Sequence, residues 1–192
     1  MRIYKVSGDL DNFDVCGLDK EACRESFNLG HLEDWDLHID FDGSSQEKDW
    51  WPRIMKRRND KPLGDYVSIL SGDVMIMERK AINKLRPLMG NVEILPLVCD
   101  FGDYLAINVM DVLECIDYEK SEFKLFKDEI WNGRPHIMRF IKYEFIKGKT
   151  EGYNIFKIID APKSRIFVNE TFVEAVEKNG ITGFKFELVW ES

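Results

Sequence analysis

The 192-residue chain has no long apolar run and few cysteines. No segment approaches the ~18 consecutive apolar residues of a membrane-spanning helix, and the first residues lack the apolar core of a secretory signal. The cysteines show no CxxC spacing and are too few for a disulfide scaffold: they are Cys16, Cys23, Cys99 and Cys115. We therefore expect a reduced protein of the cytoplasm that does not associate with membranes.

The sequence also lacks the common motifs of enzyme active sites. It contains no GxGxxG or GxxxxGK[ST] phosphate loop, no HExxH, no paired CxxC and no GxSxG. Its three histidines limit any acid–base chemistry that depends on imidazole. We therefore predict no catalytic residues and no cofactor.

The negative charge of the chain is concentrated near its start. The net charge is -8, from 27 Lys and Arg against 35 Asp and Glu, and residues 1–50 hold 13 acidic and 5 basic residues. The rest of the chain is therefore neutral. This balance excludes a general nucleic-acid-binding protein, which would be basic. The first quarter of the chain is the first place to look for a binding partner.

The densest acidic stretch, residues 33–49, is followed by adjacent tryptophans and a basic cluster at residues 53–61. Adjacent residues of a strand point to opposite faces, so Trp50 and Trp51 cannot share one face. In one interpretation, one of the two is an exposed anchor for a partner. In the other, both tryptophans close the core under the N-terminal loops. The basic cluster could also neutralise the acids locally. We predict a partner-binding surface formed by Glu33, Asp34, Trp35, Asp36, Asp40, Asp42 and Trp50.

One arrangement within this stretch has the composition of a metal site. The spacing His38-x-Asp40-x-Asp42 would place three side chains on one face of a strand, and hard cations favour carboxylates. As a calcium loop the spacing fails, because Ser44 stands at the fifth position. A solvated acidic loop explains the same residues. A metal-dependent hydrolase that uses His38, Asp40 and Asp42 stays open as an alternative.

The pattern of apolar residues predicts an α+β fold. Apolar residues at helical spacing predict one helix over residues 78–86 and a second from Asn169 to Asn179. Several segments have strand composition, and Pro96 makes the segment at 92–98 an edge or bulged strand. We expect a mainly antiparallel β-sheet with two or three helices and a loop-rich acidic N-terminal segment, residues 1–50. Together with a scaffold at 51–192 it would form a single domain spanning 1–192.

The order of segments from residue 50 onwards resembles a known family. The first half contains Trp51-Pro52, Val92-Glu93-Ile94-Leu95-Pro96-Leu97 and Tyr104-Leu105-Ala106-Ile107-Asn108. The closing part is the most specific, with Ile166-Phe167-Val168, a helix and then Gly180-Ile181-Thr182-Gly183-Phe184. In this order and spacing the segments are similar to the bacterial polymorphic-toxin immunity protein family usually numbered eleven, formerly a domain of unknown function. Met77 departs from the serine that this family tends to carry there.

This resemblance implies a non-enzymatic protein that binds and neutralises a cognate bacterial toxin. It offers no catalytic residues, and it does not cover residues 7–49, where variation specific to one partner is expected. Toxins that attack nucleic acid carry basic clefts, which an acidic surface would complement. The expected partner is therefore a cognate protein toxin, in the simplest case a nuclease, rather than nucleic acid or a membrane. A structural module that self-associates through an exposed β edge is the remaining alternative.

Overall fold

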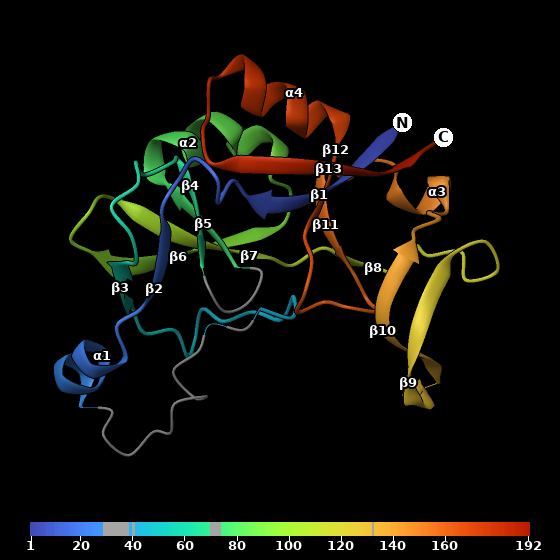
Figure 1. The fold of residues 1–192 in the computed structure, drawn as a ribbon, viewed down its shortest axis with the longest axis horizontal. Coiled ribbons are helices and arrows are strands. Elements are labelled where there is room, and N and C mark those ends of the chain that lie inside the picture. The colour runs from blue at the N-terminus through green and yellow to red at the C-terminus, as the bar shows by residue number, and fades with distance from the viewer. Residues whose placement is uncertain (29–38, 40, 70–73, 132) are drawn as a thin grey trace.

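The computed structural model describes residues 1–28, 39, 41–69, 74–131 and 133–192 (Figure 1). These residues form a closed six-stranded barrel, a five-stranded sheet and a two-stranded hairpin. They also form four α-helices and one 3-10 turn. No helix among them is both long enough and apolar enough to cross a membrane.

The barrel follows the strand order β2-β3-β6-β7-β5-β4. Its strands are β2 (Val15–Leu18), β3 (Arg53–Arg57), β4 (Tyr66–Ile69), β5 (Met75–Glu78), β6 (Val92–Cys99) and β7 (Tyr104–Val109). Apolar side chains from these strands fill its interior, and Ile39 and Phe41 join them from the segment before β3. Burial of these apolar side chains stabilises the closed barrel.

The five-stranded sheet lies beside the barrel in the order β13-β1-β12-β11-β8. Its strands are β1 (Arg2–Gly8), β8 (Val112–Leu113), β11 (Ile155–Ile158), β12 (Phe167–Asn169) and β13 (Phe184–Glu191). Strand β1 pairs antiparallel with both β12 and β13. The first eight residues of the chain are therefore an interior part of the sheet.

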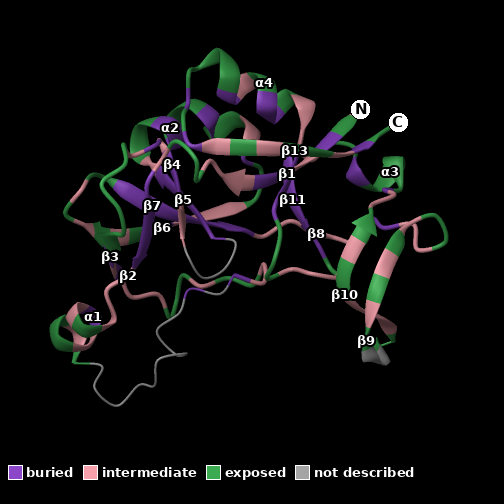
Figure 2. Ribbon diagram, viewed as in Figure 1, coloured by how far each residue is buried: buried purple, intermediate pink, exposed green. Residues whose placement is uncertain are grey.

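Helices cover one side of this sheet (Figure 1), and its strand β11 is buried along its whole length (Figure 2). Helices α2 (Arg79–Leu85) and α4 (Glu170–Lys178) share an apolar core with β1, β5, β7 and β12. The 3-10 turn η1 (Arg86–Leu88) continues α2, and α1 (Lys20–Phe27) lies against β3. On the opposite face Phe145, Phe156, Phe167 and Trp190 form an aromatic cluster.

The hairpin of β9 (Glu122–Trp131) and β10 (Arg134–Lys142) extends from this aromatic side (Figure 1). The one-turn helix α3 (Lys147–Thr150) follows it. Three register shifts interrupt the pairing of β9 with β10. Because Phe140 also packs against the aromatic cluster, the base of the hairpin is held on the five-stranded sheet.

The α+β class and both long helices expected from the sequence are confirmed. At the start of α4 the Phe172 N–H donates to Asn169 Oδ1 over 3.1 Å, which is the cap predicted from the asparagine. Most strand pairings are antiparallel, as expected, but the sheets are mixed, because β2 pairs parallel with β4, β3 with β6, and β8 with β11, and six of the strands close into a barrel that was not expected. The described residues also hold four α-helices rather than two or three, because α1 buries only Cys23 and so has no apolar stripe, and α3 spans only four residues.

Pro96 lies neither on an edge strand nor at a bulge, contrary to the expectation of one or the other, because β6 pairs with β7 and with β3 without a register shift. Strand β6 pairs with β7 as far as Pro96, and with β3 from Leu97 onwards. Proline has no N–H to donate, and here it sits where β6 passes from one neighbour to the other. Strand β6 therefore accommodates it inside a closed barrel.

Candidate functional site

Residues 41–50, which we call the strap, follow an irregular path along the outside of the described strands. They carry the described part of the acidic stretch, including Asp42, Glu47 and Asp49. Side chains from β6, β7 and β11 hold the strap at several points. Gly43 has φ +94°, and a Cβ there would lie 2.2 Å from Val112 of β8, so only glycine fits this close approach.

A buried lysine holds the start of the strap. Lys157 on β11 is only 1% exposed, and its Nζ donates a hydrogen bond to the carbonyl oxygen of Phe41. The Phe41 ring is itself buried in the barrel core. A buried ammonium group is costly unless it is hydrogen-bonded, so this contact ties the entry of the strap firmly to β11.

A carboxylate on β6 holds the middle of the strap. Glu93 accepts hydrogen bonds from Ser45 Oγ, from the Gln46 N–H over 2.9 Å and from Asn108 Nδ2 over 2.9 Å. The other hydrogen of the Asn108 amide goes to the Ser44 carbonyl over 2.7 Å. Burial alone would raise the pKa of Glu93, but these donors together hold it below its usual value. Glu93 therefore binds the strap as an anion.

Trp50 closes the strap against the barrel. Its Nε1 donates to the Pro96 carbonyl over 2.9 Å, and its ring lies 5.8 Å from that of Phe41. The Arg53 guanidinium stacks on both tryptophans, 4.4 Å from the Trp50 ring centroid and 3.8 Å from that of Trp51. Burial lowers the pKa of Arg53 to about 10, which leaves it charged at neutral pH. Trp50 is half-buried, so part of its ring still faces outward.

Asp42 shapes the first turn of the strap. Its Oδ1 accepts from the Ser44 N–H over 2.9 Å and from the Ser44 hydroxyl over 2.6 Å. These hydrogen bonds lower the pKa of Asp42, and Lys163 adds a favourable charge interaction. Asp42 therefore stays ionised, with one oxygen occupied by the turn. Further along the strap Glu47 and Asp49 are exposed.

The basic cluster after the strap is bound to an earlier part of the chain. Arg57 pairs with the buried Asp14 over 2.9 Å, and Lys56 pairs with Asp19 over 3.1 Å. Lys61 donates to the carbonyl groups of Leu10 and Asp11. Within the described residues these contacts leave the strap carboxylates unneutralised by the cluster. Of the strap carboxylates, Glu47 and Asp49 are exposed and Asp42 is half-buried.

Of the seven residues predicted for the partner surface, the structure describes Asp42 and Trp50, which lie near the two ends of the strap. The remaining five lie outside the described residues: Glu33, Asp34, Trp35, Asp36 and Asp40. His38 and Asp40 of the alternative metal site lie outside them too. Among the residues that are described, no group of three His, Cys, Asp or Glu side chains is arranged to hold a metal ion.

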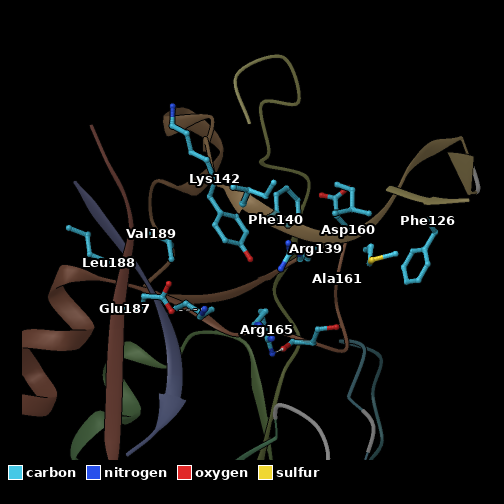
Figure 3. A pocket seen from close by; sticks show the side chains of 16 residues that line it. Phe126, Arg139, Phe140, Lys142, Asp160, Ala161, Arg165, Glu187, Leu188 and Val189 are labelled. Atoms are coloured by element: carbon cyan, nitrogen blue, oxygen red, sulfur yellow. Dashed lines mark hydrogen bonds and ion pairs between the residues drawn. The ribbon is translucent and has the colours of Figure 1, made fainter. Parts of the chain in front are cut away.

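A second surface was not predicted from the sequence. A groove of about 520 Å³ lies between β10, β13 and the loop at residues 160–165 (Figure 3). Figure 3 shows Arg139, Asp160 and Arg165 around one space, with Glu187 and Leu188 on its opposite side. In the sequence, apolar residues such as Ile141 are typical of core positions. Their alternation with polar residues was therefore only a weak indication of this surface.

Comparison with known protein families finds a match for one part of the chain. The family model described as Immunity protein family (Imm11) matches residues 101–190. The resemblance expected from the sequence is thereby confirmed over this region, which contains β7 to β12, most of β13, Lys157 and every residue of the groove lining except Lys5. The strap precedes the matched region. No match is found among the curated proteins.

Proposed function

We propose that this protein is a cytoplasmic immunity protein that binds a cognate bacterial polymorphic toxin and neutralises it without catalysis. The observation that carries the proposal is the match of residues 101–190 to the Immunity protein family (Imm11). The partner in this proposal is a protein toxin, and neither nucleic acid nor a membrane takes part.

The acidic segment is the proposed contact surface. It comprises Glu33, Asp34, Trp35, Asp36, Asp40, Asp42 and Trp50. Support comes from the strap, which carries exposed carboxylates and the half-buried Trp50 ring. Exposed like charges attract an oppositely charged partner and speed its association, and an aromatic ring at their edge adds apolar contact area.

Because the strap is anchored, it is better suited to binding a partner than an acidic loop that is only solvated. Lys157, Glu93 and Trp50 each hold it at a different point. A segment that is already ordered loses less conformational entropy when a partner docks, so more of the contact energy appears as affinity. In this proposal the toxin is a nuclease, because an acidic surface competes with phosphates for a basic cleft.

Growth protection tests the proposal. The C-terminal domain of the toxin encoded beside this chain is induced in a bacterial host with and without the chain. We expect the domain to stop growth and the chain to restore it. Reversing the charge of Asp34, Asp36, Asp40 and Asp42 to lysine should weaken protection and slow association most at low salt, because screening reduces electrostatic attraction.

A control variant keeps the same change of net charge elsewhere. Asp100, Glu151, Glu174 and Glu177 are exposed and lie away from the strap, so their reversal should leave protection intact. Failure of the unaltered chain to restore growth would contradict the immunity function. Full protection by the variant with reversed charge at Asp34, Asp36, Asp40 and Asp42, with unchanged salt dependence, would contradict the acidic contact surface alone.

A further inference from the structure

Edge strands border the groove between β10 and β13. In the described part of the chain β13 is the outermost strand of its sheet, and β10 has β9 as its one strand neighbour. An uncovered strand edge offers N–H and C=O groups to which an extended segment can add. Residues 137–143 line the groove in succession, which at about 3.3 Å per residue gives a length of roughly 20 Å. This length suits an extended segment of about six residues.

Large apolar side chains gather at the groove although they face solvent. The exposed fractions are 44% for Phe126, 53% for Met138, 58% for Ile141 and 48% for Leu188. All four line the groove, and they come from three different strands. Isolated exposed apolar residues are normal on protein surfaces, but a group around one hollow is typical of a binding site.

The charges at the groove favour an acidic occupant. Lys5 and Glu187 neutralise each other over 2.6 Å. Arg139 is exposed and makes no ion pair in the described part of the chain, and Lys142 has a long contact of 3.9 Å with Glu144. Arg165 also lines the groove. With Lys5 and Glu187 paired, the positive charges of Arg139 and Lys142 outweigh the one carboxylate of Asp160, so the lining is positive.

A carboxylate in the lining has one oxygen without a partner. Asp160 Oδ1 accepts from the Tyr118 hydroxyl over 2.5 Å. Asp160 Oδ2 is inaccessible to solvent and accepts no hydrogen bond from the described residues. Buried polar atoms are normally satisfied, so Asp160 is an exception in the lining. Because Oδ2 is closed to solvent, a segment that lies in the groove does not reach it, and the docking argument rests on the strand edges, the apolar side chains and the basic groups.

The groove adjoins the strap. The loop at residues 160–165 borders the groove, and Lys163 in the same loop interacts electrostatically with Asp42 of the strap. The apolar and basic groove and the acidic strap therefore meet at this loop.

We propose that the groove docks an extended segment of the toxin in which acidic side chains stand beside apolar ones. This inference rests on the proposed function and adds a second contact to it. The backbone of the segment lies along β10, its apolar side chains contact Met138, Ile141 and Leu188, and its acidic side chains meet Arg139 and Lys142. The strap and the groove then bind opposite charges on the same toxin.

Affinity measurements on groove variants test this inference. The probe is the C-terminal domain of the neighbouring toxin, and binding to the full chain is measured by calorimetry. Arg139→Glu and Ile141→Asp should each weaken binding at least about tenfold, because both residues lie in the contact. Both side chains are exposed, so neither variant should alter the fold. Far-ultraviolet circular dichroism checks that expectation.

The hairpin supplies matched control positions. Lys124 lies directly opposite Arg139 on β9, and Ile130 is 70% exposed near the hairpin turn, but neither lines the groove. Lys124→Glu and Ile130→Asp should change affinity less than about threefold. Hydrogen exchange of the unaltered complex gives a second readout, with protection expected at residues 137–143.

The outcomes separate this inference from the proposed function. Wild-type affinity in both groove variants, without exchange protection on β10, would overturn the groove contact and leave the immunity function standing. No binding by the unaltered chain would overturn both. A dimer of the chain in light scattering that Ile141→Asp dissociates would show that a second copy occupies the groove instead of a toxin segment.

Discussion

Replacing Glu93 by glutamine should loosen the strap while the barrel stays folded. The Glu93 carboxylate accepts from Ser45, from the Gln46 N–H and from Asn108. Glutamine keeps the size and one acceptor oxygen, and its amide can donate to the Ser45 hydroxyl. Three charge-assisted hydrogen bonds then become three neutral ones, without leaving a cavity.

The size of the effect follows from this exchange. A hydrogen bond to a charged group contributes about 1.5–3 kcal/mol, against about 0.5–1.5 kcal/mol for a neutral one. The difference is about 1–1.5 kcal/mol for each bond, and three such differences sum to about 3–4.5 kcal/mol before solvent screening is considered. Glu93 is only partly buried, so solvent screening reduces this to about 1.5 kcal/mol for local opening of the strap. That value corresponds to about tenfold faster exchange of the Gln46 amide hydrogen.

Hydrogen exchange read by mass spectrometry over residues 41–50 measures this opening. Glu47→Gln is the matched control, because Glu47 is an exposed carboxylate on the same strap and the net charge changes equally. The folded-state pKa of Glu93 is lowered, so its stabilisation is complete above the usual value of 4.5 and is lost as the pH falls through the lower folded value. The two variants should therefore differ most near pH 7. Equal exchange of Gln46 in both variants at pH 7 would refute the anchoring role of Glu93.

Further predictions concern stability and metal content. Asp14→Asn should lower the free energy of unfolding by about 2 kcal/mol at pH 7 and by less at pH 3 in urea titrations. The pKa of Asp14 is lowered in the fold by Arg57 and two backbone donors despite its burial, so its stabilisation is lost as the pH falls below 3.8. Gly183→Ala should lower the free energy of unfolding by about 3 kcal/mol or more, because the added Cβ would lie 2.0 Å from the Tyr66 carbonyl oxygen. Gly152 has a similar φ but open space around it, so Gly152→Ala should lower the free energy of unfolding by only about 1 kcal/mol. Elemental analysis of purified protein should find no stoichiometric divalent metal, and one equivalent would favour the hydrolase alternative instead.

Helices α2 and α4 could be predicted because their signals are local. The apolar spacing of α4, its Asn169 cap and the glycine after it all lie within a dozen residues. Closure of the barrel depends instead on pairing between strands that are far apart in the sequence. The four-residue strand β2 pairs parallel with β4 across more than fifty residues, and nothing within β2 encodes that partner.

The contacts that hold the strap could not be predicted from the sequence either. Lys157 interrupts an apolar strand and reads as a solvent-facing residue, yet all four residues of β11 are buried. Its acceptor is a backbone carbonyl 116 positions away, which carries no residue-type signal. For Trp50 the sequence allowed an exposed anchor or a plug of the core. The structure makes the ring half-buried with its N–H bound to Pro96, so contact with a toxin stays a prediction.

Titration of toxin activity with the purified chain tests the central claim most directly. The claim is that the chain neutralises its toxin by binding, with no chemical step. It predicts that the activity of the C-terminal toxin domain falls immediately and in proportion to added chain, and reaches its minimum near one equivalent. Progressive loss of activity at a small fraction of an equivalent would show catalytic inactivation, and full activity at excess chain would show no neutralisation. Either result would contradict the account.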